Sequence, residues 1–309
     1  MTADALLVVL SAFTLRTMQE PANTAAVWNK LPVSRPAVST APVKRNEGSL
    51  GIDIAAASAI VIDADSGAVL FEKNADQIMP VASLTKLVTA MTYLDQKPDL
   101  TTAISIEPSD DPVLGKTVLP TEERFTAKEV FDALLIGSVN ESANALARSS
   151  LGTEPFVKKM NEKAQTLGLK RLSFTDPSGE GSRNVGNARE IAQALKMATT
   201  YPEITAAMRR SSVTLRGVKK PYQINTTNLL LTSDLNKGNL KILGAKTGTL
   251  PEAGYCFAQM TQGPDGQKVI VVLLGGETHF SRFQDVKALT YWAFDTYEWP
   301  GRVQASLTR

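Results

Sequence analysis

Short runs of β-branched and apolar residues lie near both ends of the chain, and helix-type patterns lie between them. The runs cover residues 59–62, 68–71, 242–247, 255–261 and 269–274. Turn-forming residues at 63–67 and 263–266 separate two of the neighbouring pairs and predict hairpins. Because strands at both ends enclose a helical middle, we expect an α+β fold, with an antiparallel sheet flanked by helices and an inserted, mostly helical subdomain.

The middle of the chain shows start and stop signals for several helices. Thr126 and Glu129 form a capping box that predicts a helix to about Ile136. Further helices are expected over residues 141–149, 155–167, 187–200 and 283–297. Residues 101–125 indicate short strands and turns, and the Pro and Gly content of 175–184 requires a loop.

We therefore predict three parts in the chain. Residues 1–50 contain an apolar run at 5–15, which is too short to span a bilayer comfortably and is typical of an export signal, followed by a flexible linker. Residues 51–300 form the folded domain, and 301–309 form a tail. Within the domain we expect a sheet layer from about 51–82 and 240–298, and a helical subdomain from about 83–239. A buried or disordered N-terminal helix is the alternative for the apolar run.

Composition excludes several classes of site. A net charge of +2 argues against a large nucleic-acid surface. One cysteine, Cys256, excludes an intrachain disulfide, and no His/Asp/Glu cluster has metal-ligand spacing, so we expect no metal and no cofactor. The one histidine, His279, would have to serve any Ser-His-Asp triad, yet no Gly-x-Ser-x-Gly turn supplies the serine.

The stretch from Pro80 to Met91 carries the pair of residues that is most informative about chemistry. Its apolar residues keep helical spacing, which predicts a helix with one buried face. Ser83 and Lys86, three residues apart, lie on the same side of such a helix. A desolvated lysine can take the proton of a serine hydroxyl, and free N–H groups in a first turn can stabilise an oxyanion. The pair predicts a Ser-Lys acyl-transfer centre, although such pairs also occur by chance on solvated helices.

Two further sequence fragments favour the catalytic interpretation of Ser83 and Lys86 over a chance pair. Ser138-Val139-Asn140 falls in the bend between two expected helices, and Lys246-Thr247-Gly248-Thr249 falls in an expected strand. The set resembles the three-motif signature of penicillin-recognising serine enzymes. From about residue 53 to 294 the chain resembles the low-molecular-mass D-alanyl-D-alanine carboxypeptidases, also through Asp176-Pro177-Ser178-Gly179. The stretch 110–116 resembles the D,D-endopeptidase branch of that family.

The resemblance implies roles for the motif residues. Ser83 is the acylated nucleophile and Lys86 its proton acceptor, with a pKa lowered by burial and by the like charge of Lys246. Ser138 relays the proton to the leaving amine. Asn140 holds Lys86 and the substrate amide.

The same resemblance assigns substrate binding to the third motif. Lys246 and Thr247 bind the terminal carboxylate of a D-Ala-D-Ala peptide or of a β-lactam, and Gly248 permits close approach of the substrate. Thr249 contributes its N–H to the oxyanion hole together with that of Ser83.

The implied protein is a periplasmic or extracytoplasmic serine D,D-peptidase with peptidoglycan peptides as substrate and β-lactams as covalent inhibitors. We expect no C-terminal membrane anchor, because residues 298–301 break any long amphipathic pattern. Three alternatives stay open: a serine β-lactamase that uses Glu180, an idle peptidoglycan-binding protein, and a Ser-His hydrolase that uses His279.

Overall fold

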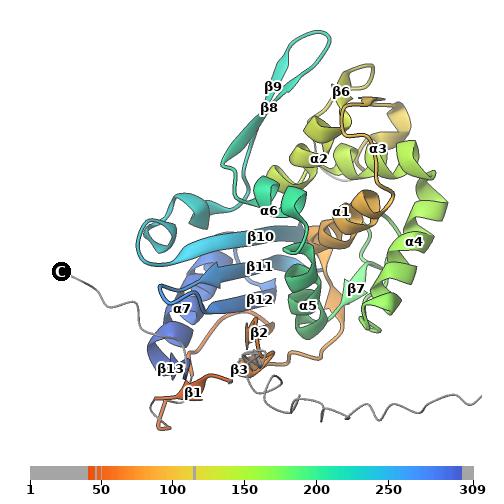
Figure 1. Cartoon of the computed structure of the whole chain (residues 1–309). Helices are drawn as coiled ribbons and strands as arrows, with labels where there is room; N and C mark the ends of the chain where they lie inside the picture. Colours follow the sequence, from red (N-terminus) through yellow and green to blue (C-terminus); the bar gives the residue numbers. More distant parts are fainter. Residues whose placement is uncertain (1–40, 46, 50, 114–115, 301–309) are drawn as a thin grey trace, which may run out of the picture. The chain divides into compact units, whose positions relative to one another are not determined.

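The computed structural model describes residues 41–45, 47–49, 51–113 and 116–300 (Figure 1). The apolar run expected to be an export signal, residues 5–15, and the expected tail, 301–309, lie outside the described residues, as does most of the expected linker.

The centre of the fold is a five-stranded antiparallel sheet in the order β10-β11-β12-β2-β3 (Figure 1). Its strands are β2 (Ser58–Asp63), β3 (Val69–Lys73), β10 (Lys241–Leu250), β11 (Gly254–Gln262) and β12 (Lys268–Gly276). The two predicted hairpins join β2 to β3 and β11 to β12. Pairing of β12 with β2 joins the late strands to the early ones, and β10 and β3 form the edges of the sheet.

Side chains alternate between the two faces of the sheet, as the period of a strand requires. In β12, Ile270, Val272 and Leu274 belong to one core cluster, whereas Val269 and Val271 belong to the other. Both faces are therefore buried, which explains why the sequence shows continuous apolar runs here rather than polar alternation.

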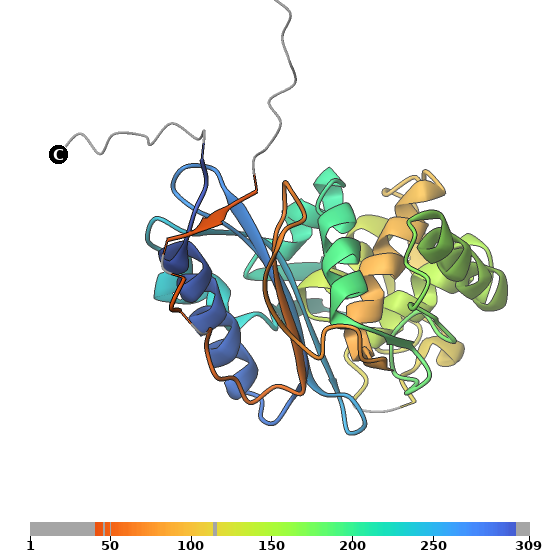
Figure 2. The ribbon, with the colours of Figure 1, turned by 90° about the horizontal axis from the view of Figure 1, so that it is seen from below.

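Helices cover each face. On one side, α7 (Ser281–Thr296) packs against β2, β11 and β12. On the other, α5 (Ala188–Ala198) packs against the same three strands, and α6 (Pro202–Met208) packs against β10. Figure 2 shows α7 on one side of the sheet and α5 among the helices on the other. This arrangement confirms the expected α+β class with a sheet flanked by helices.

The middle of the chain begins with the 3₁₀-helix η3 (Ala82–Thr85) and continues directly into α1 (Lys86–Asp95). The other helices of this part are α2 (Ala127–Ile136), α3 (Asn140–Ser150) and α4 (Thr153–Thr166). The capping box at the start of α2 is present, with the Thr126 side chain accepting the Glu129 N–H. Gly168, two residues beyond α4, has a φ of +77°, which glycine adopts without strain.

Short elements complete the fold. The small paired strands are β1 (Val43–Lys44) with β13 (Tyr297–Glu298), β4 (Met79–Pro80) with β7 (Val185–Gly186), β5 (Ala103–Ser105) with β6 (Arg124–Thr126), and β8 (Ser212–Arg216) with β9 (Pro221–Asn225). The 3₁₀-helices are η4 (Pro108–Asp110), η5 (Leu229–Thr232) and η6 (Asp234–Asn236). Sequence patterns assigned no element to residues 201–239, so α6 and the β8–β9 hairpin are additions of the structure. No helix in the described part of the chain has both the length and the apolar character needed to cross a bilayer.

Candidate active site

Ser83 and Lys86 meet where η3 passes into α1. Ser83 lies inside the 3₁₀-helix and Lys86 is the first residue of α1, so the pair sits on a tighter turn than the α-helix predicted from the sequence. The Lys86 side chain is 0% exposed, and its Nζ lies 3.0 Å from Ser83 Oγ. The contact expected between the two side chains is present.

Two further acceptors fix the Lys86 amine. Nζ lies 2.6 Å from Asn140 Oδ1 and 2.5 Å from the backbone carbonyl of Ser178. Asn140 is the first residue of α3, directly after the bend that contains Ser138. With Ser83, Asn140 and Ser178 around it, the amine has three hydrogen-bond partners in a site closed to solvent.

The loop 175–184 brings the Ser178 carbonyl to this point. Asp176 Oδ1 accepts the N–H groups of Ser178 and Gly179, and Asn184 Nδ2 donates to Thr85 Oγ1. The loop is thereby tied both to itself and to η3. The sequence identified this stretch as a loop and as a point of family resemblance, but gave no sign that one of its carbonyls would contact Lys86.

Backbone conformations around the serine are unusual. Ala82 has a φ of 48° and Ser138 a φ of 60°, in the left-handed region that residues other than glycine rarely adopt. Gly179 has a φ of +82°, and a Cβ built on it would lie 2.1 Å from the Ala82 carbonyl oxygen. Tight packing of the Gly179 backbone on Ala82 thus helps to hold the segment that carries Ser83.

The third motif lies on the edge strand β10. Lys246 is 1% exposed, and its Nζ donates to Ser138 Oγ at 2.6 Å and to the Thr247 carbonyl at 2.8 Å. Thr247 Oγ1 lies 2.6 Å from Thr227 Oγ1. Lys246 therefore connects β10, which carries the third motif, to the bend before α3.

Gly248 allows β10 to lie directly against η3. A Cβ on Gly248 would lie 3.1 Å from Ala82 Cβ and 3.2 Å from the Ser83 backbone nitrogen. The absence of a side chain thus accommodates the protein's own backbone. The expectation that Gly248 also gives room to a substrate stays a prediction.

The pKa values of both buried lysines are lowered, but the like charge of Lys246, which was expected to lower the pKa of Lys86, is not among the causes at Lys86. Burial lowers the pKa of Lys86 from 10.5 to about 7, although nearby carboxylates, Glu180 foremost, oppose the change. Burial also lowers the pKa of Lys246 well below its ordinary value, and the positive charges of Lys86 and Arg282 lower it further. At neutral pH a neutral amine is therefore accessible at Lys86, which a solvated lysine would not provide.

A cavity of about 400 Å³ opens above these groups. Six of the eight residues predicted for the site line it, namely Ser83, Ser138, Asn140, Thr247, Gly248 and Thr249. The other two, Lys86 and Lys246, lie beneath it and are bonded to Ser83 and Ser138. The structure thus brings all eight together from three separate segments.

The sequence model of the D-alanyl-D-alanine carboxypeptidase family, peptidase family S11, matches residues 42–278. The chain belongs to this family. It is 31% identical over 270 residues to the D-alanyl-D-alanine endopeptidase of Pseudomonas aeruginosa, covering 83% of each chain. It is also 31% identical over 254 residues to a D-alanyl-D-alanine carboxypeptidase of Bacillus subtilis, covering 79% of this chain and 63% of the relative.

The fold agrees with solved members of the same group. Penicillin-binding protein D2 of Listeria monocytogenes, solved in its cefotaxime-bound form, superposes with a TM-score of 0.69 at 28% identity, over 79% of this chain and 99% of that one. Membership of the family confirms the expected resemblance and the expected enzyme class, a serine D,D-peptidase.

Sequence reasoning missed one side chain of the D,D-peptidase site. Arg282, at the start of α7, lines the cavity and donates from Nη1 to the Gly248 carbonyl and to Thr249 Oγ1, both at 3.0 Å. Burial lowers its pKa to about 10. Its position after β12 carries no motif, and only the packing of α7 on the sheet brings it to β10.

His279 lines the same cavity but is placed for packing. Its ring lies edge-on to Tyr255, Phe280 and Phe283, with centroids 5.0–6.1 Å apart. The hydroxyl of Ser83 is bonded to Lys86 instead. This geometry favours the lysine as proton acceptor over the Ser-His alternative.

Proposed function

We propose that the chain cleaves peptide bonds that follow D-alanine in peptidoglycan peptides, through an acyl-enzyme on Ser83. The observation that carries the proposal is the buried Lys86 amine held between Ser83, Asn140 and Ser178. A neutral amine has two N–H donors and one lone pair. The two N–H groups donate to Asn140 Oδ1 and the Ser178 carbonyl, and the lone pair accepts the Ser83 proton.

Each proton that moves during acylation has a donor and an acceptor in this site. Ser83 Oγ attacks the D-alanine carbonyl carbon and Lys86 takes its proton, forming the C–O bond of a tetrahedral intermediate. The C–N bond breaks as Ser138 passes a proton to the leaving amine and is itself reprotonated from Lys86. Water hydrolyses the acyl-enzyme in the second step. The bond from Lys246 Nζ to Ser138 Oγ keeps that hydroxyl in place.

Substrate binding uses the free edge of β10. In the described sheet β10 has a neighbour on one side only, and an extended peptide can align along the other edge. Thr247 and Thr249 hydroxyls, with Lys246 and Arg282 behind them, provide a positive site for a carboxylate. The backbone N–H groups of Ser83 and Thr249 form the oxyanion hole, a type of site in which loss of one donor typically costs about 3 kcal/mol of barrier.

We propose the endopeptidase activity over the carboxypeptidase activity. The stretch 110–116 and the similarity to the Pseudomonas aeruginosa endopeptidase support this choice. The substrate is then a cross-linked peptide, and the leaving amine belongs to a second peptide rather than to free D-alanine.

Peptidoglycan as substrate implies a location outside the cytoplasmic membrane, and β-lactams acylate Ser83 as substrate mimics. The cefotaxime-bound relative supports the second point. The division of the folded part into a sheet layer and a helical subdomain at about residues 83 and 239, and the export signal, remain predictions.

Digestion of purified peptidoglycan tests the proposal directly. Wild type and Ser83→Ala are incubated with cross-linked dimers and with pentapeptide monomers, and the products are identified by mass spectrometry. Conversion of dimers to monomers by wild type alone supports the endopeptidase, whereas release of D-alanine from pentapeptides supports the carboxypeptidase. No product from either substrate, with intact binding, would point to an idle binding protein.

Turnover of a chromogenic cephalosporin separates the peptidase from a β-lactamase. A β-lactamase needs a base that activates water against the acyl-enzyme, and Glu180 is the residue placed in the corresponding loop. Here Glu180 Oε2 accepts from Ser178 Oγ and from the Val113 N–H, both at 3.4 Å. We expect a long-lived acyl-enzyme; hydrolysis at many turnovers per second would favour the β-lactamase.

A further inference from the structure

A second cavity, of about 530 Å³, lies at the opposite ends of the two helices that begin at the serine centre. α1 begins with Lys86 and α3 with Asn140, and the two helices pack against each other. Tyr93, which lines the cavity, is seven residues beyond Lys86 on α1, a rise of about 10 Å, so the cavity lies about two helical turns away from the reacting groups. It is a separate site with its own lining.

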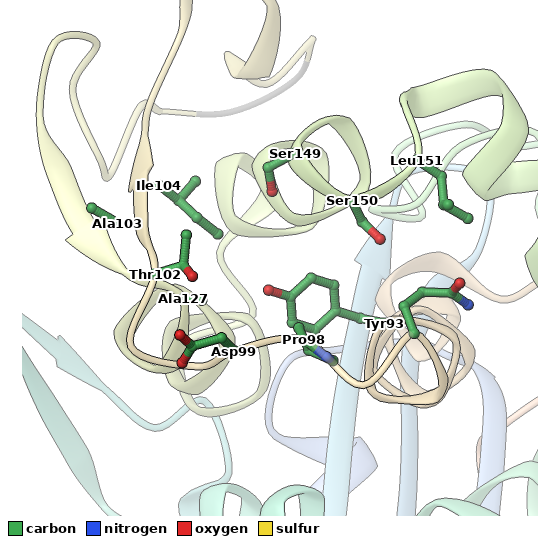
Figure 3. Close-up of a pocket in the computed structure, with 11 residues that line it drawn as sticks. Tyr93, Pro98, Asp99, Thr102, Ala103, Ile104, Ala127, Ser149, Ser150 and Leu151 are labelled. Carbon is green, nitrogen blue, oxygen red and sulfur yellow. The ribbon is translucent and has the colours of Figure 1, made fainter.

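Tyr93 forms the interior of this cavity. Its side chain is 4% exposed and stacks on Phe131, with ring centroids 6.2 Å apart. Its hydroxyl has no hydrogen-bond partner among the described residues. Figure 3 shows the ring in the middle of the cavity, with the hydroxyl directed toward the space between Asp99, Thr102 and Ser149. A hydroxyl without a protein partner, on a side chain that is otherwise buried and lines a cavity, indicates a position for a polar ligand atom.

The polar lining favours positive charge. Asp99 Oδ1 accepts two hydrogen bonds from Thr101, and Oδ2 has no hydrogen-bond partner among the described residues. Gln96 Nε2 donates to the Thr92 carbonyl, which leaves Oε1 as an acceptor. Among the described residues that line the cavity there is no Lys, Arg or His. The C-terminal ends of α1 and α3 add partial negative charge from their last carbonyls.

The remaining lining combines the hydroxyl groups of Thr102, Ser149 and Ser150 with apolar side chains. Pro98, Ala103, Ile104 and Leu151 contribute aliphatic surface next to the polar groups (Figure 3). A ligand that satisfies both parts has a cationic nitrogen with several N–H donors and an alkyl chain of a few carbons. An anionic or purely apolar ligand would leave Asp99 or the Tyr93 hydroxyl without a partner.

We propose that this cavity binds a primary alkylammonium group of the kind carried by a lysine-type diamino acid side chain. The Asp99 carboxylate receives the charge, the Tyr93 hydroxyl and Gln96 Oε1 accept two of its N–H groups, and the aliphatic residues contact its methylenes. The proposal does not depend on the activity assigned to Ser83.

Titration followed by protein NMR tests the site with a matched pair of probes. Nα-acetyl-lysine amide carries the ammonium, and Nα-acetyl-norleucine amide keeps the alkyl chain but lacks the charge. We expect saturable shifts at residues around Tyr93 with the lysine probe, weakening as salt is raised because ion attraction is screened. Equal binding of the norleucine probe, or no saturable shift with the lysine probe, would overturn the proposal.

Two conservative variants locate the contacts. Asp99→Asn keeps the oxygen that accepts from Thr101 but removes the charge, and should weaken the lysine probe about tenfold. Tyr93→Phe keeps the stacking on Phe131 and should weaken it about threefold to tenfold. Glu154→Gln, which removes an exposed carboxylate on α4 outside the cavity, is the matched control and should change nothing.

A third probe distinguishes another class of ligand. An N-acetylated disaccharide offers hydroxyl donors without charge. Saturable binding of the disaccharide, undiminished by Asp99→Asn, together with weak binding of the lysine probe, would replace the alkylammonium with a sugar and contradict the proposal.

Discussion

The two ends of α1 and α3 differ in how their polar groups are satisfied. At the N-terminal ends, the Lys86 amine has three hydrogen-bond partners in the protein and no contact with solvent. At the C-terminal ends, Tyr93 and Asp99 line an open cavity, and the Tyr93 hydroxyl and Asp99 Oδ2 have no hydrogen-bond partner among the described residues. The same two helices therefore carry one site whose polar groups are already hydrogen-bonded within the protein and one with polar groups that have no protein partner.

Burial changes a pKa at both ends, in opposite directions. It removes the water that stabilises a lysine cation, so the pKa of Lys86 falls to about 7, and it raises the pKa of Tyr93 to about 12. Asp99 is exposed, and hydrogen bonds from Thr101 lower the pKa of its carboxyl. A fixed and desolvated site suits chemistry, whereas a solvated and open one suits reversible binding.

Among variants at the two ends of α1 and α3, Ser83→Ala is expected to have the largest effect on acylation. Without the hydroxyl no acyl-enzyme forms, so labelling by a fluorescent penicillin should be lost altogether while the melting temperature stays close to that of wild type. Ser149→Ala, at the other end of α3, is the control and should label normally. Persistent labelling of the Ser83 variant would place the nucleophile elsewhere.

Lys86→Met is expected to have the second-largest effect on acylation. The substitution keeps an unbranched chain but removes the base, so the second-order rate constant of acylation should fall by about a thousandfold. Lys97→Met, just beyond the other end of α1, should leave the rate constant unchanged. A loss of less than about tenfold would rule out Lys86 as the proton acceptor in acylation.

The pH dependence tests the lowered pKa itself. Only neutral Lys86 accepts a proton, so below pH 7 the acylation rate constant should rise about tenfold per pH unit, and above about pH 7 it should level off. Stopped-flow measurement with a probe that does not itself titrate in this range gives the profile. A rate constant that continues to rise about tenfold per pH unit through pH 9, without levelling off near pH 7, would mean that burial does not lower this pKa.

Gly179→Ala tests how the serine segment is held. The new Cβ would meet the Ala82 carbonyl, so we expect a loss of more than about 2 kcal/mol of unfolding free energy together with several-fold slower acylation. Gly168→Ala is the matched control, because that glycine also has a positive φ but has open space around it. It should cost only about 1 kcal/mol and leave acylation unchanged. Equal losses of stability from both variants would show that conformational strain, and not the contact with Ala82, is the cause.

Asp99→Asn is expected to have the smallest effect on acylation of Ser83. Because the change lies beyond the opposite end of α1 from Ser83 and keeps the Thr101 contact, acylation should stay within about twofold of wild type. A larger decrease in the acylation rate would mean that the two ends are coupled through α1 and α3.

The sequence determined the class of fold and the identity of the reacting groups. Local periodicity set the strands of the sheet and most helices, and the Thr126–Glu129 capping box set the start of α2. Residues three apart in one turn, such as Ser83 and Lys86, must be neighbours whatever the rest of the chain does. The third motif, around Lys246, was recognised because its residue types match a known set.

Tertiary structure alone decided what surrounds those groups. The Ser178 carbonyl that contacts Lys86 is 92 residues away, and a backbone carbonyl has no sequence signature of its own. Arg282 reaches β10 only because α7 packs on the sheet, and Gly248 proves to face η3. The cavity around Tyr93 likewise depends on how α1 and α3 end beside each other. Burial, and with it the pKa of Lys86, is a property of the packed chain, because it depends on which distant segments exclude water from a given side chain.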